Sequence, residues 1–195
     1  MLTALVPIVL TLAGCSTTEP GSAVSHETGT TTVPPAVTTP PLTEKPEPDA
    51  PPEIRDGPAP GDWARRPCDL LDDASARAVG IAGSAEVSTI STLGGKCLRE
   101  QDGQRLEYVL YSEYSLFYQP YTRTTKWRYY GEAGLGRQLA GVFADEDPPT
   151  RECLVAVGLT AESSLEVTLS GPEDPDVCER ALAVAAHVVD GIARG

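Results

Sequence analysis

Five cysteines carry most of the chemistry open to this 195-residue chain, and they fall into two groups. Cys15 stands alone behind Leu12-Ala13-Gly14, whereas the remaining four lie far downstream, at Cys68, Cys97, Cys153 and Cys178. A thiol can carry a lipid, pair into a disulfide, act as a nucleophile or bind a metal. Zinc binding is disfavoured because the four cysteines lack Cys-x-x-Cys spacing and only one histidine, His187, lies in the same part of the sequence. We therefore expect no metal and no cofactor, and two disulfides in one of three possible pairings.

Nucleophilic catalysis lacks its other components. A serine triad would have to use His187, and no Gly-x-Ser-x-Gly elbow accompanies it. The glycine-rich segment 131–137 lacks both phosphate-binding spacings, so we interpret it as a turn with left-handed residues. Asp145-Glu146-Asp147 lacks the spacing of a calcium loop and is interpreted as a solvated turn. We expect no catalytic residue, and a protein that is not an enzyme.

Residues 1–14 form a short, uncharged apolar run, too short for a bilayer span of roughly 20 residues. Its end, Leu12-Ala13-Gly14-Cys15, resembles the lipobox of bacterial lipoproteins. That resemblance implies a signal peptide over 1–14 and a diacylglycerol thioether, with acyl chains such as palmitate, on Cys15. Two or more acyl chains hold a protein durably, here on the extracytoplasmic face of the cell membrane. The alternative is a buried element with an incidental cysteine, since the cationic start of most signals is missing.

The next segment predicts a tether. Residues 16–62 hold eleven prolines and nine threonines but no aromatic residue, so they cannot offset the entropy of ordering. We expect lipidated Cys15 and a disordered Thr/Pro-rich tether over 15–62, reaching about 145 Å if extended at ~3.1 Å per residue. O-glycosylation of its threonines is an alternative role. Residues 63–195 then form one domain, with 13 basic and 20 acidic side chains. This acidic balance argues against nucleic-acid binding and against attraction to anionic lipid.

Patterning over 63–195 predicts an α+β fold. Asp72 can cap a short helix over 73–79, which Gly80 ends, and Asp102-Gly103 predicts a hairpin turn. A second helix, capped by Asp174, has an apolar stripe that runs to Ile192. We expect an antiparallel sheet of about five to six strands, packed by the short N-terminal helix and the long C-terminal helix. The predicted strands are 86–91, 96–101, 105–112, 138–144, 152–159 and 164–170.

Several short motifs occur in an order that resembles a family of actinobacterial secreted lipoproteins, whose C-terminal domain is one of unknown function. They are Pro67-Cys68-Asp69-Leu70-Leu71, Val79-Gly80, Cys97, Gly134-Leu135-Gly136, Cys153-Leu154-Val155-Ala156-Val157, and Cys178 followed by Ala181. The resemblance implies sequential disulfides, Cys68–Cys97 and Cys153–Cys178, and a fold that is Mog1/PsbP-like or kinase-sensor-like. The chain departs from the family after Cys97, where members carry a tryptophan and this chain has Leu98-Arg99-Glu100.

One segment has an unusual composition. All seven tyrosines fall between residues 108 and 130, together with three cations on an otherwise acidic domain. Aromatic and basic side chains together suit partner docking, whereas tyrosines also suit half-buried positions in a loop that covers the sheet edge. The candidate interaction surface consists of Tyr114, Tyr118, Tyr121, Arg123, Lys126, Trp127 and Arg128.

These observations predict a monomeric, membrane-anchored lipoprotein with a non-enzymatic binding or interaction domain in the cell envelope. Its partner would be an envelope protein or a small ligand. The first alternative is a small-ligand or lipid carrier with a cavity between the C-terminal helix and the sheet. The second is a cell-wall-modifying enzyme, which would need two convergent carboxylates in a cleft.

Overall fold

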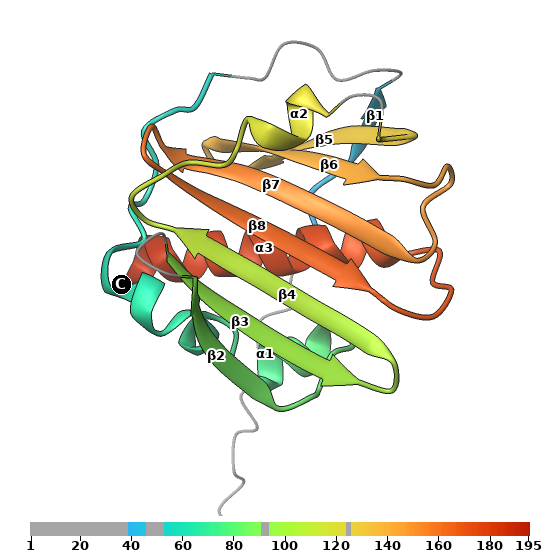
Figure 1. Cartoon of the computed structure of the whole chain (residues 1–195), viewed down its shortest axis with the longest axis horizontal. Helices are drawn as coiled ribbons and strands as arrows, with labels where there is room; N and C mark the ends of the chain where they lie inside the picture. Colours follow the sequence, from blue (N-terminus) through green and yellow to red (C-terminus); the bar gives the residue numbers. More distant parts are fainter. Residues whose placement is uncertain (1–38, 46–52, 91–93, 124–125) are drawn as a thin grey trace, which may run out of the picture. The chain divides into compact units, whose positions relative to one another are not determined.

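The computed structural model describes residues 39–45, 53–90, 94–123 and 126–195. It is an α+β fold built on one antiparallel sheet of eight strands, in the order β1-β5-β6-β7-β8-β4-β3-β2 (Figure 1). The strands are β1 (Thr43–Lys45), β2 (Ala85–Ile90), β3 (Gly94–Gln101), β4 (Gln104–Tyr111), β5 (Tyr129–Leu135), β6 (Gln138–Ala144), β7 (Glu152–Thr160) and β8 (Ser163–Ser170). The helices are α1 (Asp73–Ala78), α2 (Gln119–Thr122) and α3 (Val177–Arg194), with 3₁₀ turns η1 (Gly61–Arg65) and η2 (Pro67–Leu70).

The predicted antiparallel sheet is confirmed, and its hairpins follow from local sequence. Asp102 and Gly103 join β3 to β4 with φ values of 50° and 79°, which the tight hairpin turns with two left-handed residues require. Strands β7 and β8 form the second predicted hairpin. The Asp72 side chain caps α1 by accepting the Ser75 N–H at 2.7 Å, as the sequence predicts.

The predicted strand count of five to six is wrong, because β1 and β5 were not predicted. The segment that we interpreted as a glycine-rich turn is mostly strand β5, which pairs with β6 along all seven residues. In this segment only Gly136, with φ of 61°, has the left-handed conformation of a turn. Glycines in a strand sequence resemble a turn because they lack the β-branched side chains typical of strands.

The folded part also begins before residue 63. Strand β1, inside the predicted tether, pairs with β5 through Thr43, Glu44 and Lys45, and Lys45 forms an ion pair with Glu132. Further along, the Gly57 N–H donates to the Leu159 carbonyl at 2.9 Å. Both stretches therefore belong to the domain. The remaining tether residues, 15–38 and 46–52, lie outside the described residues, as do the predicted signal peptide and Cys15.

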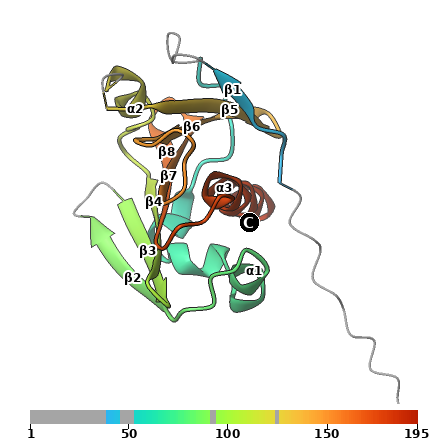
Figure 2. The same ribbon diagram turned by 90° about the vertical axis from the view of Figure 1, so that its right-hand side faces the viewer.

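The inner face of the sheet carries the main core. Figure 2 shows α3 and α1 on this face and α2 on the opposite one. The stripe of α3 predicted from its periodicity is fully buried against Val155, Val157 and Leu165 of β7 and β8. The predicted cap is displaced, since Asp174 accepts the Asp176 N–H at 3.0 Å and α3 begins only at Val177. Burial of this helix removes a long apolar stripe from water, which stabilises the fold.

Two disulfides link the helical side to the sheet. Cys68 of η2 pairs with Cys97 of β3, and Cys153 of β7 pairs with Cys178 of α3. The sequential pairing is therefore the one adopted. The bridges close loops of 29 and 25 residues, and each such loop is worth about 3.5 kcal/mol in the chain-entropy model.

Arg99, two residues after Cys97 on β3, is a buried cation. Its side chain is 2% exposed and lies on the inner face of β3. The guanidinium donates to the Leu71 and Gly83 carbonyls, both at 2.8 Å, and to the Asp73 carboxylate at 2.9 Å. Arg99 thus joins η2, α1 and the loop before β2 to the sheet.

Candidate interaction surface

The described part of the chain between β4 and β5, which carries many of the aromatic side chains, crosses the outer face of the sheet, where α2 lies (Figures 1 and 2). Phe117 and Tyr121 point inward and join Tyr130, Phe143 and Ala156 in a second core cluster. The Tyr121 ring lies 5.3 Å from that of Phe117 and 5.1 Å from that of Phe143. We predicted a loop that covers the sheet edge. The structure instead places this segment over the face of the sheet.

Hydrogen bonds hold the segment in place at both ends. The Leu116 N–H donates to the Ser164 hydroxyl of β8 at 3.0 Å. Farther on, the Trp127 indole N–H donates to the Pro120 carbonyl at 2.8 Å, and the Arg128 N–H donates to the Ala144 carbonyl of β6 at 2.9 Å. These bonds hold the described backbone at both ends of the segment, which reduces the entropy that binding would cost.

The outward side chains form what we call the display surface: Tyr114, Tyr118, Arg123, Lys126 and Arg128, all exposed. Tyr114 is 55% exposed and Tyr118 is 41% exposed, and they are two of the three large apolar side chains exposed in the described part of the chain. Lys126 stacks over the Trp127 ring at 4.3 Å. Exposed aromatic rings beside cations are typical of contact surfaces.

The other two residues of the predicted surface lie elsewhere. Tyr121 is only 4% exposed and belongs to the second core cluster, so its assignment to a contact surface is corrected. Trp127 is half-buried and packs against that cluster, at 5.5 Å from the Phe143 ring. Its ring supports the surface from beneath. Sequence alone could not separate the rings that point inward from those that point outward.

A half-buried carboxyl group lies near the display surface. Glu166 of β8 accepts a hydrogen bond from the Tyr111 hydroxyl at 3.4 Å. Burial raises the pKa of Glu166, while the Tyr111 hydrogen bond and the charge of Arg123 oppose the rise. Burial likewise raises the pKa of Tyr111. Arg123 therefore acts both as an exposed cation and as a partial counter-charge to Glu166.

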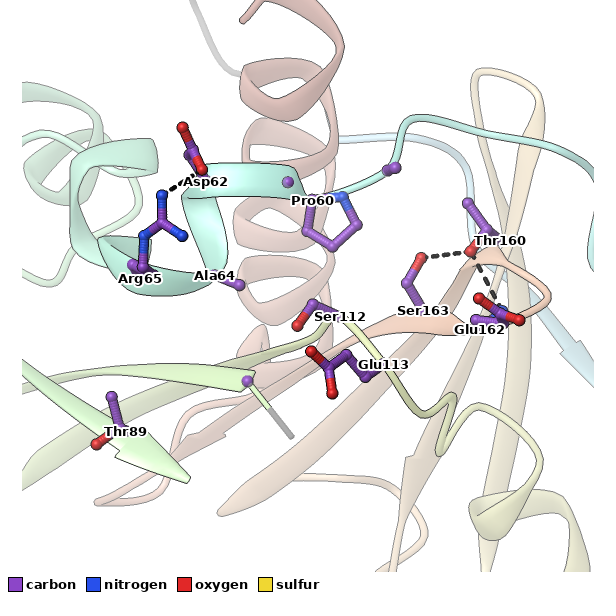
Figure 3. A pocket seen from close by; sticks show the side chains of 13 residues that line it. Pro60, Asp62, Ala64, Arg65, Thr89, Ser112, Glu113, Thr160, Glu162 and Ser163 are labelled. Carbon is purple, nitrogen blue, oxygen red and sulfur yellow. Dashed lines mark hydrogen bonds and ion pairs between the residues drawn. The ribbon is translucent and has the colours of Figure 1, made fainter. Parts of the chain in front are cut away.

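A polar pocket of about 610 Å³ opens at Ser112 and Glu113, just after β4 ends (Figure 3). Its walls come from four stretches that are distant in sequence, including η1 and the β7–β8 turn. Glu113 and Glu162 line it, with the hydroxyls of Thr160 and Ser163 at 2.7 Å from each other. No sequence signal identified this pocket, because none of its four stretches carries a motif of its own.

The remaining candidates for chemistry are His187, which lines one pocket together with Asp72 and Ser75, and the acidic turn at 145–147. His187 has no hydrogen-bond partner among the described residues, and Asp72 caps α1 by accepting the Ser75 N–H. Burial lowers the pKa of His187, and the Ser75 hydrogen bonds lower that of Asp72. At the 145–147 turn, the Glu146 carboxylate accepts a hydrogen bond from the Thr150 hydroxyl, with 3.0 Å between the oxygens. No group of three histidine, cysteine or acidic side chains is placed to hold a metal within the described parts of the chain.

Fold and surface together define an α+β domain, stapled by two disulfides, that presents an aromatic and basic surface over one sheet face. Comparison with known proteins finds no matching family model, no matching curated protein and no matching solved structure. None of the helices in the described residues is long and apolar enough to cross a bilayer.

Proposed function

We propose that this chain is an extracytoplasmic lipoprotein, anchored by Cys15, whose domain binds an envelope partner through the display surface without catalysing a reaction. The observation that carries the proposal is the display surface itself. Three exposed cations and two exposed tyrosines stand on a backbone fixed by buried rings, although the domain is acidic overall. Side chains of this kind complement an acidic partner. The partner we favour is therefore an acidic envelope protein.

The test for the display surface is crosslinking in cells from a photoreactive residue at position 118. Replacing Arg123, Lys126 and Arg128 together by glutamine should lower the yield of the crosslinked partner roughly tenfold, because complementary charges steer association. The matched control replaces Arg77, Arg137 and Arg151 by glutamine, which removes the same charge from exposed sites elsewhere. Equal yields from the two triple variants would show that the display surface is not the contact site.

The anchor is tested separately. A Cys15→Ser variant is expected to leave the membrane fraction and to lose labelling by palmitate analogues, since the acyl chains supply the membrane affinity. The structure describes the chain from residue 39, so 23 residues (16–38) separate Cys15 from the described part. Extended at ~3.1 Å per residue, they would reach about 70 Å. Continued membrane association and labelling of Cys15→Ser would refute the anchor.

Membership of the actinobacterial lipoprotein family is part of the same proposal and rests on the ordered motifs, against which stands the missing tryptophan after Cys97. The Mog1/PsbP-like or kinase-sensor-like fold is part of the same proposal, supported by the antiparallel sheet and the long C-terminal helix. An experimental structure superposed on those folds tests it.

The small-ligand carrier remains a second candidate, favoured by an apolar pocket beside α3. That pocket lies at the C-terminal end of the helix, and the side of α3 that faces the sheet is filled by core side chains.

A further inference from the structure

The apolar pocket lies between the last turns of α3 and the short helices η1, η2 and α1. Its volume is about 420 Å³, within the range of small-molecule sites, which is roughly 300–1,000 Å³. Trp63 of η1 and Leu70 of η2 form apolar walls. Arg66 stacks over the Trp63 ring at 4.4 Å and fixes its orientation. The pocket is thus built from elements that the Cys68–Cys97 bridge and Arg99 hold to the sheet.

A glycine on α3 keeps this pocket open. Gly191 lies where α3 passes Leu70, and a Cβ at this position would stand 3.0 Å from Leu70 Cδ2. Glycine costs a helix interior about 0.5–1 kcal/mol relative to alanine. Here it leaves room between the helix and η2, and any larger side chain would project toward Leu70 and narrow the cavity.

His187, one turn before Gly191, supplies a polar group without a hydrogen-bond partner among the described residues. It is half-buried and lines the cavity. Burial and the charge of Arg194 lower its pKa, which favours the neutral ring near pH 7. A neutral imidazole offers one donor and one acceptor. Apolar walls with a small number of polar groups are the usual form of a small-ligand site.

The charges around the pocket restrict what it can bind. Asp69 and Asp72 both line it, and Arg194 is the cation among the lining residues. Arg66, which stacks over Trp63, pairs with Asp69 at 3.4 Å, so the two carboxylates and two guanidiniums balance. The pocket therefore offers no net positive charge to offset the lost hydration of a small anion, and an anionic ligand is disfavoured. The apolar walls likewise disfavour a fully polar molecule, because its hydration would be lost without compensation.

We propose that this pocket binds a small uncharged amphiphile, with a ring-sized apolar body against Trp63 and Leu70 and one hydroxyl group hydrogen-bonded to His187. This site is separate from the display surface and does not depend on the function proposed for it. The two sites lie on opposite faces of the sheet, because α3 and α2 cover opposite faces (Figure 2). The pocket would let the domain carry a small molecule while it is bound to its partner.

The test uses the full chain with isotopically labelled histidine, titrated with p-cresol and followed by imidazole NMR. The chain has two histidines, so His26 serves as an internal reference. We expect p-cresol to shift the His187 signals saturably, with a Kd of about 1 mM, as for other fragment-sized ligands. The anion p-toluate, similar in shape, should bind at least tenfold more weakly.

Two variants establish where the probe binds. Gly191→Val should weaken p-cresol binding at least tenfold by filling the pocket, and Gly191→Ala, the safer variant for folding, should weaken it severalfold. Ala193→Val places the same valine side chain two residues away, at an exposed position, and should leave binding unchanged. The proposal is overturned if His187 does not shift saturably, if p-toluate binds as well as p-cresol, or if both Gly191 variants bind p-cresol like the native chain.

Discussion

Replacing Arg99 by alanine is expected to lower the free energy of unfolding by about 2–6 kcal/mol, since two buried backbone carbonyls lose their donor at roughly 1–3 kcal/mol each. The guanidinium is almost completely buried and donates to two backbone carbonyls and one carboxylate. Alanine would leave the Leu71 and Gly83 carbonyls without this donor in a buried site. It would also loosen η2 and α1 from the sheet, so the pocket at His187 should open with them.

The effect is measured by urea denaturation of Arg99→Ala beside Arg105→Ala. Arg105 forms ion pairs with Glu100 and Glu107 on the exposed part of the β3–β4 hairpin. Exposed pairs are worth about 0–1 kcal/mol, so Arg105→Ala should change stability little. Arg99→Lys should fall between the two, because an ammonium cannot donate in the fork geometry of a guanidinium. An Arg99→Ala protein as stable as Arg105→Ala would contradict this account.

The parts of the fold that sequence predicts are those specified locally. The β3–β4 hairpin follows from Asp102-Gly103 between alternating strands, and α3 from a stripe that repeats at helical spacing. Both signals lie within one element. The α+β class could therefore be predicted before any contact was known.

The missed parts depend on contacts between distant residues. Strand β1 is three residues long, and its own sequence is typical of a linker. It becomes a strand because the exposed edge of β5 offers backbone partners and Glu132 offers a counter-charge to Lys45. Strand β5 is held in the same way, between β1 and β6. No local pattern contains this information.

The candidate interaction surface was likewise predictable only in its local features. Its composition was visible in the sequence, but the direction of each ring was not. Phe117 and Tyr121 turn inward because α2 lies over Phe143, whereas Tyr118, beside Phe117 in the sequence, remains exposed. The pocket at His187 could not be predicted either, since it needs η1, η2, α1 and α3 together.

Replacing Tyr121 tests whether the display surface depends on the buried cluster beneath it. Tyr121→Ala should lower the free energy of unfolding by about 3–5 kcal/mol, the cost typical of removing a buried aromatic ring. It should also weaken partner binding, because Tyr121 anchors α2 between Phe117 and Phe143. Tyr118→Ala should weaken binding as well but change stability by less than about 0.5 kcal/mol, as surface substitutions do.

Tyr121→Phe separates the ring from its hydroxyl. The Tyr121 hydroxyl oxygen is buried and has no hydrogen-bond partner among the described residues. The hydroxyl oxygen lies against Gly141, 2.4 Å from the place that a Cβ would occupy, so a glycine at this position leaves room for it. An unsatisfied buried hydroxyl costs about 1–3 kcal/mol, so its removal should stabilise the protein by roughly 1 kcal/mol or leave it unchanged. The three variants are compared by denaturation for stability and, with the photoreactive residue moved to position 114, by crosslinking for partner binding. A destabilised Tyr121→Phe would mean that the hydroxyl has a partner, and a Tyr121→Ala protein that binds normally would mean that the cluster does not position the surface.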